Sequence, residues 1–215
     1  EKCTFEDCSS SSQGGAVFFD NSFVSESSIE DCKFINNKAA QNGGALYFAP
    51  CGNSKLSKCL FVNNSCTSSD NIRGSSIYVY IQNLNSKSAL KNLKLQDDDD
   101  SKVVIEGNRF RSQPVEGSQQ MYINLKKTGN LQLGENAFSF NGVQEAPKDS
   151  KYIQVRADEG AQLAVTGEIC VDSTKTDLIS GIDSNIKYDC HRADQEFHNQ
   201  QPGGKKGKTN VGMSV

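Results

Sequence analysis

Apolar and polar residues alternate along this chain in short segments that recur about every 28 residues. One such segment has the form Cys-x-Phe or Asn-x-Phe, and the next begins with a Gly-Gly pair followed by Ala and an apolar run. The first column consists of Phe5, Phe34, Phe61, Phe110 and Phe138. The second column begins with Gly14, Gly15, Gly43 and Gly44, and a degenerate copy follows at Gly74-Ser75. Because both columns keep the same register, the chain is built from an internal repeat.

A repeat of this length is typical of a solenoid, a propeller or an array. Alternation over four to six residues predicts short strands, and no segment has the periodicity of an amphipathic helix. Equivalent strands of successive repeats lack a hairpin pattern, so we expect an all-β fold, a right-handed parallel β-helix. Its turns would stack about 4.8 Å apart, which places the phenylalanines in an interior ladder.

Two residue types are expected at the corners of this helix. Asn37 and Asn64 should stack at one corner, because the Asn side chain satisfies backbone groups and tolerates left-handed φ and ψ. The Gly pairs should let the chain turn inside its neighbours, since glycine carries no Cβ.

The repeats predict a domain of about six coils over residues 1–190. The pattern blurs between Tyr80 and Asp100, where Leu90, Leu93 and Leu95 favour an extra coil with a protruding loop. Residues 191–215 are rich in Gln, Gly and Lys and have little to bury, so they are interpreted as a flexible linker or juxtamembrane tail.

At these residues the chain resembles the Phe-x-x-Asn and Gly-Gly-Ala-Ile repeats of chlamydial polymorphic outer-membrane proteins and trichomonad surface proteins. Phe34-Ile-Asn-Asn37 with Gly43-Gly-Ala-Leu46 matches in full, whereas Cys8 stands where the first copy should have Asn. The resemblance covers roughly residues 1–80. It implies an extracellular β-helical stalk used in attachment to host cells.

Composition narrows the class of protein further. The formal charge of -3 and the lack of a basic stripe argue against nucleic-acid binding. Eight cysteines in this sequence favour an oxidising compartment. Cys170 and Cys190 are predicted to form a disulfide near the end of the domain. The repeat column of Cys3, Cys32 and Cys59 leaves both free thiols and disulfides open.

Candidate chemistry is sparse. The run from Asp97 to Asp100 indicates a solvated loop tip rather than a Ca²⁺ site, so no metal and no cofactor is expected. Asn63 begins a glycosylation sequon. Tyr78, Tyr80 and Tyr122 form a glycan-binding strip if they face outward, and about half of them are expected in the core.

The function expected from these features is an extracellular stalk and adhesin of a surface protein, with a host-cell or extracellular glycan or protein as receptor. One alternative is a polysaccharide-active β-helical enzyme, although Asp31, Glu106 and Glu135 occupy different columns or turns. Another is a self-assembling filament joined through the helix ends. The chain starts inside a repeat, so we expect an ectodomain fragment, with a membrane segment beyond Val215.

Overall fold

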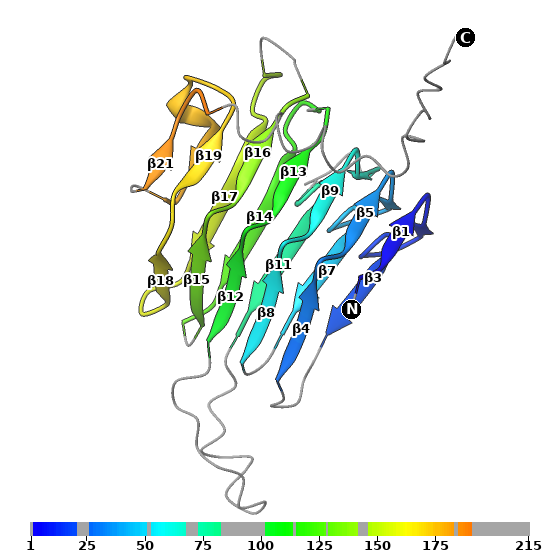
Figure 1. The fold of residues 1–215 in the computed structure, drawn as a ribbon, viewed down its shortest axis with the longest axis horizontal. Coiled ribbons are helices and arrows are strands. Elements are labelled where there is room, and N and C mark those ends of the chain that lie inside the picture. The colour runs from blue at the N-terminus through cyan, green and yellow to red at the C-terminus, as the bar shows by residue number, and fades with distance from the viewer. Residues whose placement is uncertain are drawn as a thin grey trace, which may run out of the picture.

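The computed structural model describes residues 2–20, 26–50, 53–67, 73–82, 102–113, 115–127, 129–141, 146–182 and 185–190. Within them the strands form four sheets, and every pairing between strands is parallel. Figure 1 shows the strands side by side in chain order, from the blue first turn to the orange last one. The chain is therefore a parallel β-helix, as predicted.

Each sheet collects one strand per turn. Sheet A consists of β1 (Thr4–Glu6), β5 (Lys33–Ile35), β9 (Leu60–Val62), β13 (Arg109–Arg111), β16 (Ala137–Ser139), β19 (Ile169–Val171) and β21 (Ile186–Lys187). Sheet B consists of β2 (Ser9–Ser10), β6 (Lys38–Ala39) and β10 (Ser65–Cys66). Sheet C consists of β3 (Val17–Asp20), β7 (Leu46–Ala49), β11 (Ile77–Ile81), β14 (Gln119–Leu125), β17 (Lys151–Ala157) and β20 (Ile179–Ser180). Sheet D consists of β4 (Ser27–Glu30), β8 (Ser54–Ser57), β12 (Val103–Glu106), β15 (Asn130–Gly134) and β18 (Gln162–Val165).

The described residues make about five complete turns, and the expected six is wrong by one. Sheets A, C and D each receive a strand in turns 1 to 5, whereas the sixth turn has β19, the 3-10 helix η1 (Thr176–Leu178) and β20 but no sheet D strand. The extra coil expected between Tyr80 and Asp100 is absent, because β8 pairs directly with β12 and β9 pairs directly with β13. Residues 83–101 themselves lie outside the described residues.

The phenylalanine column forms an aromatic ladder inside the helix. Consecutive rings are stacked with centroids 5.0, 4.8, 4.8 and 4.6 Å apart, from Phe5 to Phe138. Phe34, Phe61, Phe110 and Phe138 have no exposed surface. Val171 continues the register of Phe138, while Phe140 leaves the column and stacks on Tyr152.

Asparagines join successive turns at the corner between sheets A and B. Asn64 donates from Nδ2 to the carbonyl of Phe34 at 2.9 Å, and its Oδ1 accepts the backbone N–H of Asn37 at 2.9 Å. Asn37 makes the same pair of bonds to Phe5 and Cys8 in the first turn. The left-handed conformation is found at the preceding residues, Asn36 (φ 53°) and Asn63 (φ 51°). In each Asn-Asn pair the first residue therefore makes the turn and the second bonds the backbone of the neighbouring turn.

A second asparagine ladder lies at the corner between sheets D and A, and the sequence reading missed it. Asn108 and Asn136 are buried two residues before Phe110 and Phe138. Asn136 donates from Nδ2 to the carbonyl of Ile105, and its Oδ1 accepts the backbone N–H of Asn108. Asn108 likewise donates to the carbonyl of Leu56 and accepts the backbone N–H of Cys59. In turns 1 to 3 the same column holds Cys3, Cys32 and Cys59.

The two glycines of each pair are required for different reasons, the first for its backbone conformation and the second for lack of space. Gly14 and Gly43 have φ of 61° and 66°, a region that side chains disfavour. A Cβ on Gly44 would lie 2.5 Å from the carbonyl oxygen of Ser65 on β10 and 1.9 Å from that of Ser75. In the next copy Ser75 replaces the second glycine, and among the described residues sheet B has no strand beyond β10 that would lie against Ser75.

The last turn is closed by the disulfide between Cys170 and Cys190. The disulfide packs with Leu60 and Ala137 in a small cluster apart from the main core, to which the buried Leu178, Ile179 and Ile182 belong. Asn185 donates from Nδ2 to the carbonyl of Val165, and this bond satisfies one backbone group at the edge of β18. Residues 191–215, where the flexible tail was predicted, lie outside the described residues.

Replacing Phe34 with Ala should destabilise the protein by about 3 to 5 kcal/mol, because it removes a fully buried ring from the middle of the ladder. The measurement is the free energy of unfolding in urea. Phe18→Ala is the control, since Phe18 is 55% exposed and should change little. Equal stability of Phe34→Ala and wild type would contradict the ladder.

Candidate functional site

A second aromatic ladder runs along the outer face of sheet C. It consists of Phe18, Tyr47, Tyr78 and Tyr122, which are paired in register on β3, β7, β11 and β14. Their neighbours in the sequence, such as Leu46 and Phe48, belong to the core. Since side chains alternate across a strand, the four rings point away from the interior. We call this set the outer aromatic column.

The rings of the outer aromatic column stack on one another and present their edges to the outside. Centroids are 4.8, 5.2 and 5.5 Å apart, and neighbouring rings are within 14° of parallel. Exposure falls along the column, from 55% at Phe18 to 6% at Tyr78 and 4% at Tyr122. A ligand on this face would therefore reach the ring of Phe18 and part of Tyr47, whereas Tyr78 and Tyr122 are buried.

Polar groups flank the column on the same face. Asn124 donates from Nδ2 to the Tyr78 hydroxyl at 3.4 Å, while its Oδ1 has no hydrogen-bond partner. Tyr80 is half-buried beside Tyr78 and donates from its hydroxyl to Oε1 of Gln82 at 2.7 Å. The guanidinium of Arg73 lies 5.3 Å from the centre of the Tyr122 ring, a cation–π distance.

Burial keeps the hydroxyl of Tyr47 in its neutral form. Desolvation is the largest cause that raises the pKa of Tyr47 to about 12, and the nearby hydroxyl of Tyr78 is the second. At neutral pH this hydroxyl is therefore a hydrogen-bond donor as well as an acceptor. Together with Tyr80 and Asn124, it supplies the mixed donors and acceptors that bind hydroxyl-rich ligands.

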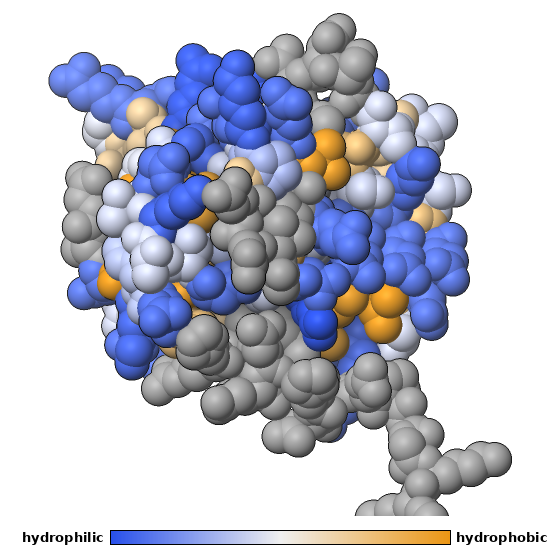
Figure 2. Space-filling view, turned by 90° about the horizontal axis from the view of Figure 1, so that it is seen from above, coloured by the Kyte–Doolittle hydropathy of each residue, from blue (hydrophilic) through white to orange (hydrophobic). Residues whose placement is uncertain are grey.

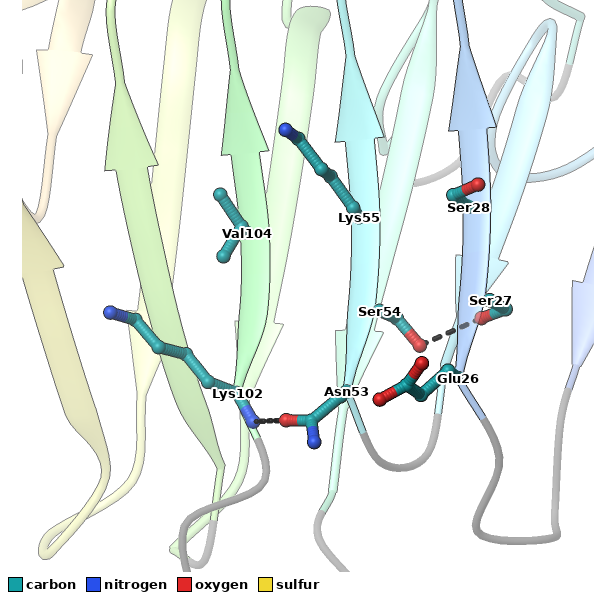
Figure 3. A pocket seen from close by; sticks show the side chains of 8 residues that line it. All are labelled: Glu26, Ser27, Ser28, Asn53, Ser54, Lys55, Lys102 and Val104. Carbon is teal, nitrogen blue, oxygen red and sulfur yellow. Dashed lines mark hydrogen bonds between the residues drawn. The ribbon is translucent and has the colours of Figure 1, made fainter. Parts of the chain in front are cut away.

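A shallow polar groove of about 460 Å³ opens on the outer face of sheet D (Figure 3). Three neighbouring strands contribute to it, with Ser28, Lys55 and Val104 side by side on β4, β8 and β12. Two of its hydrogen bonds cross between turns, one joining Ser27 Oγ and Ser54 Oγ at 2.7 Å and one from the Lys102 N–H to Asn53 Oδ1 at 3.0 Å. Lys55 also forms a 3.0 Å ion pair with Glu106. The groove is open and polar, unlike the aromatic face of sheet C.

Figure 2 shows a further view of the molecule, in which the visible surface is largely hydrophilic. Apolar side chains appear there in small separate groups rather than in one broad patch. Among the described residues, Phe18 and Val115 are the large hydrophobic side chains that are mostly exposed. Aromatic residues on the outside are thus concentrated along sheet C.

The structure places the three tyrosines of the predicted strip on one face. Tyr78, Tyr80 and Tyr122 lie on the outer side of sheet C, yet Tyr78 and Tyr122 are buried and Tyr80 is half-buried, in keeping with the expectation that about half of them are buried. Phe18 and Tyr47 were missed as members of the strip. Their signal was the aromatic residue three positions after the second glycine of each pair.

The candidate glycosylation residue is accessible. Asn63 is exposed at the corner after β9, and its neighbour Asn64 is buried. A glycan attached to Asn63 would therefore point into solvent and would not disturb the hydrogen bonds by which Asn64 joins the turns.

The carboxylates considered for an enzyme do not converge. Asp31 and Glu135 occupy the same corner column but are separated by three turns, or about 14 Å at the strand spacing. Glu106 is engaged by Lys55 on sheet D. Among the described residues no group of three His, Cys, Asp or Glu side chains is arranged to hold a metal ion.

In the described part of the chain, the cysteines other than Cys170 and Cys190 form no disulfide. Cys32 donates from Sγ to the carbonyl of Glu30, and Cys59 does the same to Ser57. Burial raises the pKa of Cys59 and of Cys66 to about 12. Both thiols therefore stay protonated and unreactive in the folded state.

Residues 31–49 match a family described as the Chlamydia polymorphic membrane protein (Chlamydia_PMP) repeat. The chain carries a repeat of the Chlamydia polymorphic membrane protein type. The matched segment contains Phe34, Asn37 and the Gly43-Gly44 pair, so the resemblance seen in the sequence is confirmed. No curated protein and no solved structure matches the chain.

The polymorphic membrane protein repeat and the β-helix together fit the stalk of a surface or outer-membrane protein. In the described ranges no helix has the length and apolar character needed to cross a membrane.

The buried thiols make stability fall at alkaline pH. Above the ordinary thiol pKa near 9 the unfolded chain loses these protons and the folded chain keeps them, so stability is lost as pH rises from about 9 toward 12. In Cys66→Ala this loss should be smaller, by up to about 1.4 kcal/mol per pH unit. Urea unfolding at about pH 8 and about pH 10.5 measures the difference. The same pH slope in both proteins would refute the raised pKa of Cys66.

Proposed function

We propose that this chain is part of an extracellular surface protein, in which the β-helix is a stiff stalk and the outer face of sheet C attaches to glycans on cells or in their surroundings. The observation that carries the adhesive part is the outer aromatic column with its polar flank. The stalk part is supported by the matched repeat and the continuous inner ladder.

Stiffness follows from how the turns are joined. The first five turns are joined to one another by strand pairing in three sheets, by stacked rings and by asparagine amides that bond backbone groups one turn away. Such contacts involve only neighbouring turns, as in other solenoids, so the domain can carry a binding face away from a surface without a long-range core.

The chemistry of the sheet C face favours a glycan. The half-buried rings and hydroxyls of Tyr47 and Tyr80 and the Arg73 guanidinium offer hydrogen-bond donors and acceptors beside apolar ring atoms. Sugar rings present the matching combination, with hydroxyls around their rims and C–H groups on their faces. The spacing of about 5 Å between rings suits an extended oligosaccharide that runs along the helix axis.

This proposal is tested by binding of the purified protein to an array of β-linked hexose oligomers, sialylated glycans and glycosaminoglycans. Tyr80→Ala and Asn124→Ala should weaken binding of the selected glycan about tenfold, equivalent to about 1.4 kcal/mol. Val115→Ser is the control, because Val115 is exposed in the loop between β13 and β14, outside the strands of sheet C, and its replacement should leave the affinity unchanged.

Three outcomes would reject the proposal: binding to none of these glycans, equal affinity of the sheet C variants and wild type, or depolymerisation of the bound polysaccharide. The last would establish the polysaccharide-active enzyme instead. Circular dichroism of each variant separates loss of the site from loss of the fold.

A further inference from the structure

Positive charge is gathered on one part of the sheet C side of the helix. In the third, fourth and fifth turns this side comprises residues 73–82, 119–127 and 151–160, which contain five basic residues and two acidic ones. The basic residues are Arg73, Lys126, Lys127, Lys151 and Arg156, and the acidic ones are Asp158 and Glu159. The equivalent residues of the first two turns, 14–20 and 43–50, contain one acidic residue and no basic one. The formal charge of the whole chain is -3, so the positive charge of turns three to five is a local feature.

Arg156 lies on the outer side of sheet C, near the end of β17. It is exposed, and it follows the core residue Val155, so it points away from the interior. Arg156 pairs in register with Asn124 on β14, and Asn124 pairs with Tyr80 on β11. Figure 1 shows these three strands side by side. Tyr80, Asn124 and Arg156 thus form a second outward column beside the outer aromatic column, and we call it the polar column.

The guanidinium of Arg156 is accessible from the side of the next turn as well. β20 is the next strand of sheet C, and it ends at Ser180, which pairs with Gln154 two residues before Arg156. Within the described ranges Arg156 forms no hydrogen bond or ion pair. A guanidinium carries five N–H donors in one plane and stays charged at every ordinary pH. Arg156 therefore offers an unused cationic group at the end of the polar column.

Two lysines lie one turn before Arg156. Lys126 follows β14 and forms a 3.6 Å ion pair with Asp158, in which the two side chains are 33% and 41% exposed. The stem of Lys127 passes close to Gly160, where an added Cβ would lie 3.4 Å from its Cγ. An ion pair this exposed contributes little stability, so Lys126 can turn to another anion at small cost. The ends of β14 and β17 therefore carry three cations.

We propose that the glycan bound by sheet C is acidic, and that Arg156 holds the carboxylate of one of its uronic acids. This inference rests on the proposed function, because it names the class of glycan that the same face takes. The oligosaccharide runs along the polar column, with successive sugars over Tyr80, Asn124 and Arg156. The guanidinium donates two hydrogen bonds to one carboxylate, and Lys126 adds electrostatic attraction.

The charge distribution favours a uronate chain over a more highly charged polymer. A uronate chain carries at most one carboxylate on each sugar, with neutral hydroxyls between the charges. The polar column matches this pattern, since it has one guanidinium and two neutral hydrogen-bonding groups, Tyr80 and Asn124. A heavily sulfated chain or a nucleic acid is charged along its whole length, and it would meet Asp20 without any compensating cation in the first two turns.

The test compares hexasaccharides of polygalacturonate, polymannuronate and hyaluronan, each measured beside its own methyl ester. The ester keeps the sugar backbone and removes the charge. Calorimetry should show that at least one of the three acids binds about tenfold or more tightly than its ester, because a charged acceptor makes the stronger hydrogen bond to Arg156. Added salt should reduce this difference.

Variants of the charged residues locate the carboxylate. Arg156→Gln should weaken binding of the acid about tenfold and leave binding of the ester unchanged. Arg156→Lys keeps the charge but loses the planar pair of donors, so its affinity should lie between those of wild type and Arg156→Gln. Asp158→Asn should strengthen binding of the acid about threefold, because it releases Lys126 and removes a like charge. Lys38→Gln is the matched control, since it removes one positive charge at an exposed position on β6 of sheet B.

The outcomes separate this inference from the proposed function. Equal affinity for every acid and its ester would overturn the acidic ligand and leave a neutral glycan on sheet C. Failure of all glycans to bind, acidic or neutral, would reject the proposed function and this inference together. An Arg156→Gln variant that behaves like Lys38→Gln would overturn the assignment to Arg156. Tighter binding of a sulfated hexasaccharide, or equal competition by polyglutamate, would overturn the uronate, since charge density or charge alone would then be recognised.

Discussion

Every part of this structure depends on the single spacing at which parallel strands pair. That spacing is about 4.8 Å in any sheet, and it places equivalent residues of successive turns in direct contact. The inner phenylalanine rings are 4.6 to 5.0 Å apart, so flat rings fill the interval with little empty space. A residue in one turn is therefore constrained by the same column in the turns on either side. This constraint explains why the same residue types recur at the same position of each repeat.

The corners meet the same constraint with polar side chains. At each corner backbone groups leave the sheet ladder, and a buried N–H or C=O without a partner is costly. An asparagine amide is long enough to reach one turn back, where Asn64 bonds the carbonyl of Phe34 and the N–H of Asn37. Cys8 occupies the Asn position of the first described turn, and its backbone N–H donates to Oδ1 of Asn37. Cys32 and Cys59 bond carbonyls two residues back, and Cys59 Sγ also reaches the carbonyl of Ile29 one turn away at 3.6 Å.

The sequence predicts most of the fold because the repeat is so direct. The Phe column and the Gly pairs are visible as residue types at regular positions, and the disulfide partners as two cysteines near the end of the domain. The number of turns was less accessible, since Leu90, Leu93 and Leu95 look like a strand and only the pairing of β8 with β12 shows that no coil intervenes. The outer aromatic column was partly hidden for another reason. Phe18 and Phe19 are adjacent and both apolar, so alternation alone does not tell which one faces outward.

The central claim is that successive turns stack in register through the inner ladder. Nuclear Overhauser effects between selectively labelled phenylalanine rings test it most directly. We expect contacts from Phe34 to Phe5 and to Phe61, from Phe110 to Phe61 and to Phe138, and none between Phe5 and Phe61, which are two turns apart. Contacts between Phe5 and Phe61, or none between Phe61 and Phe110, would contradict the stacked helix.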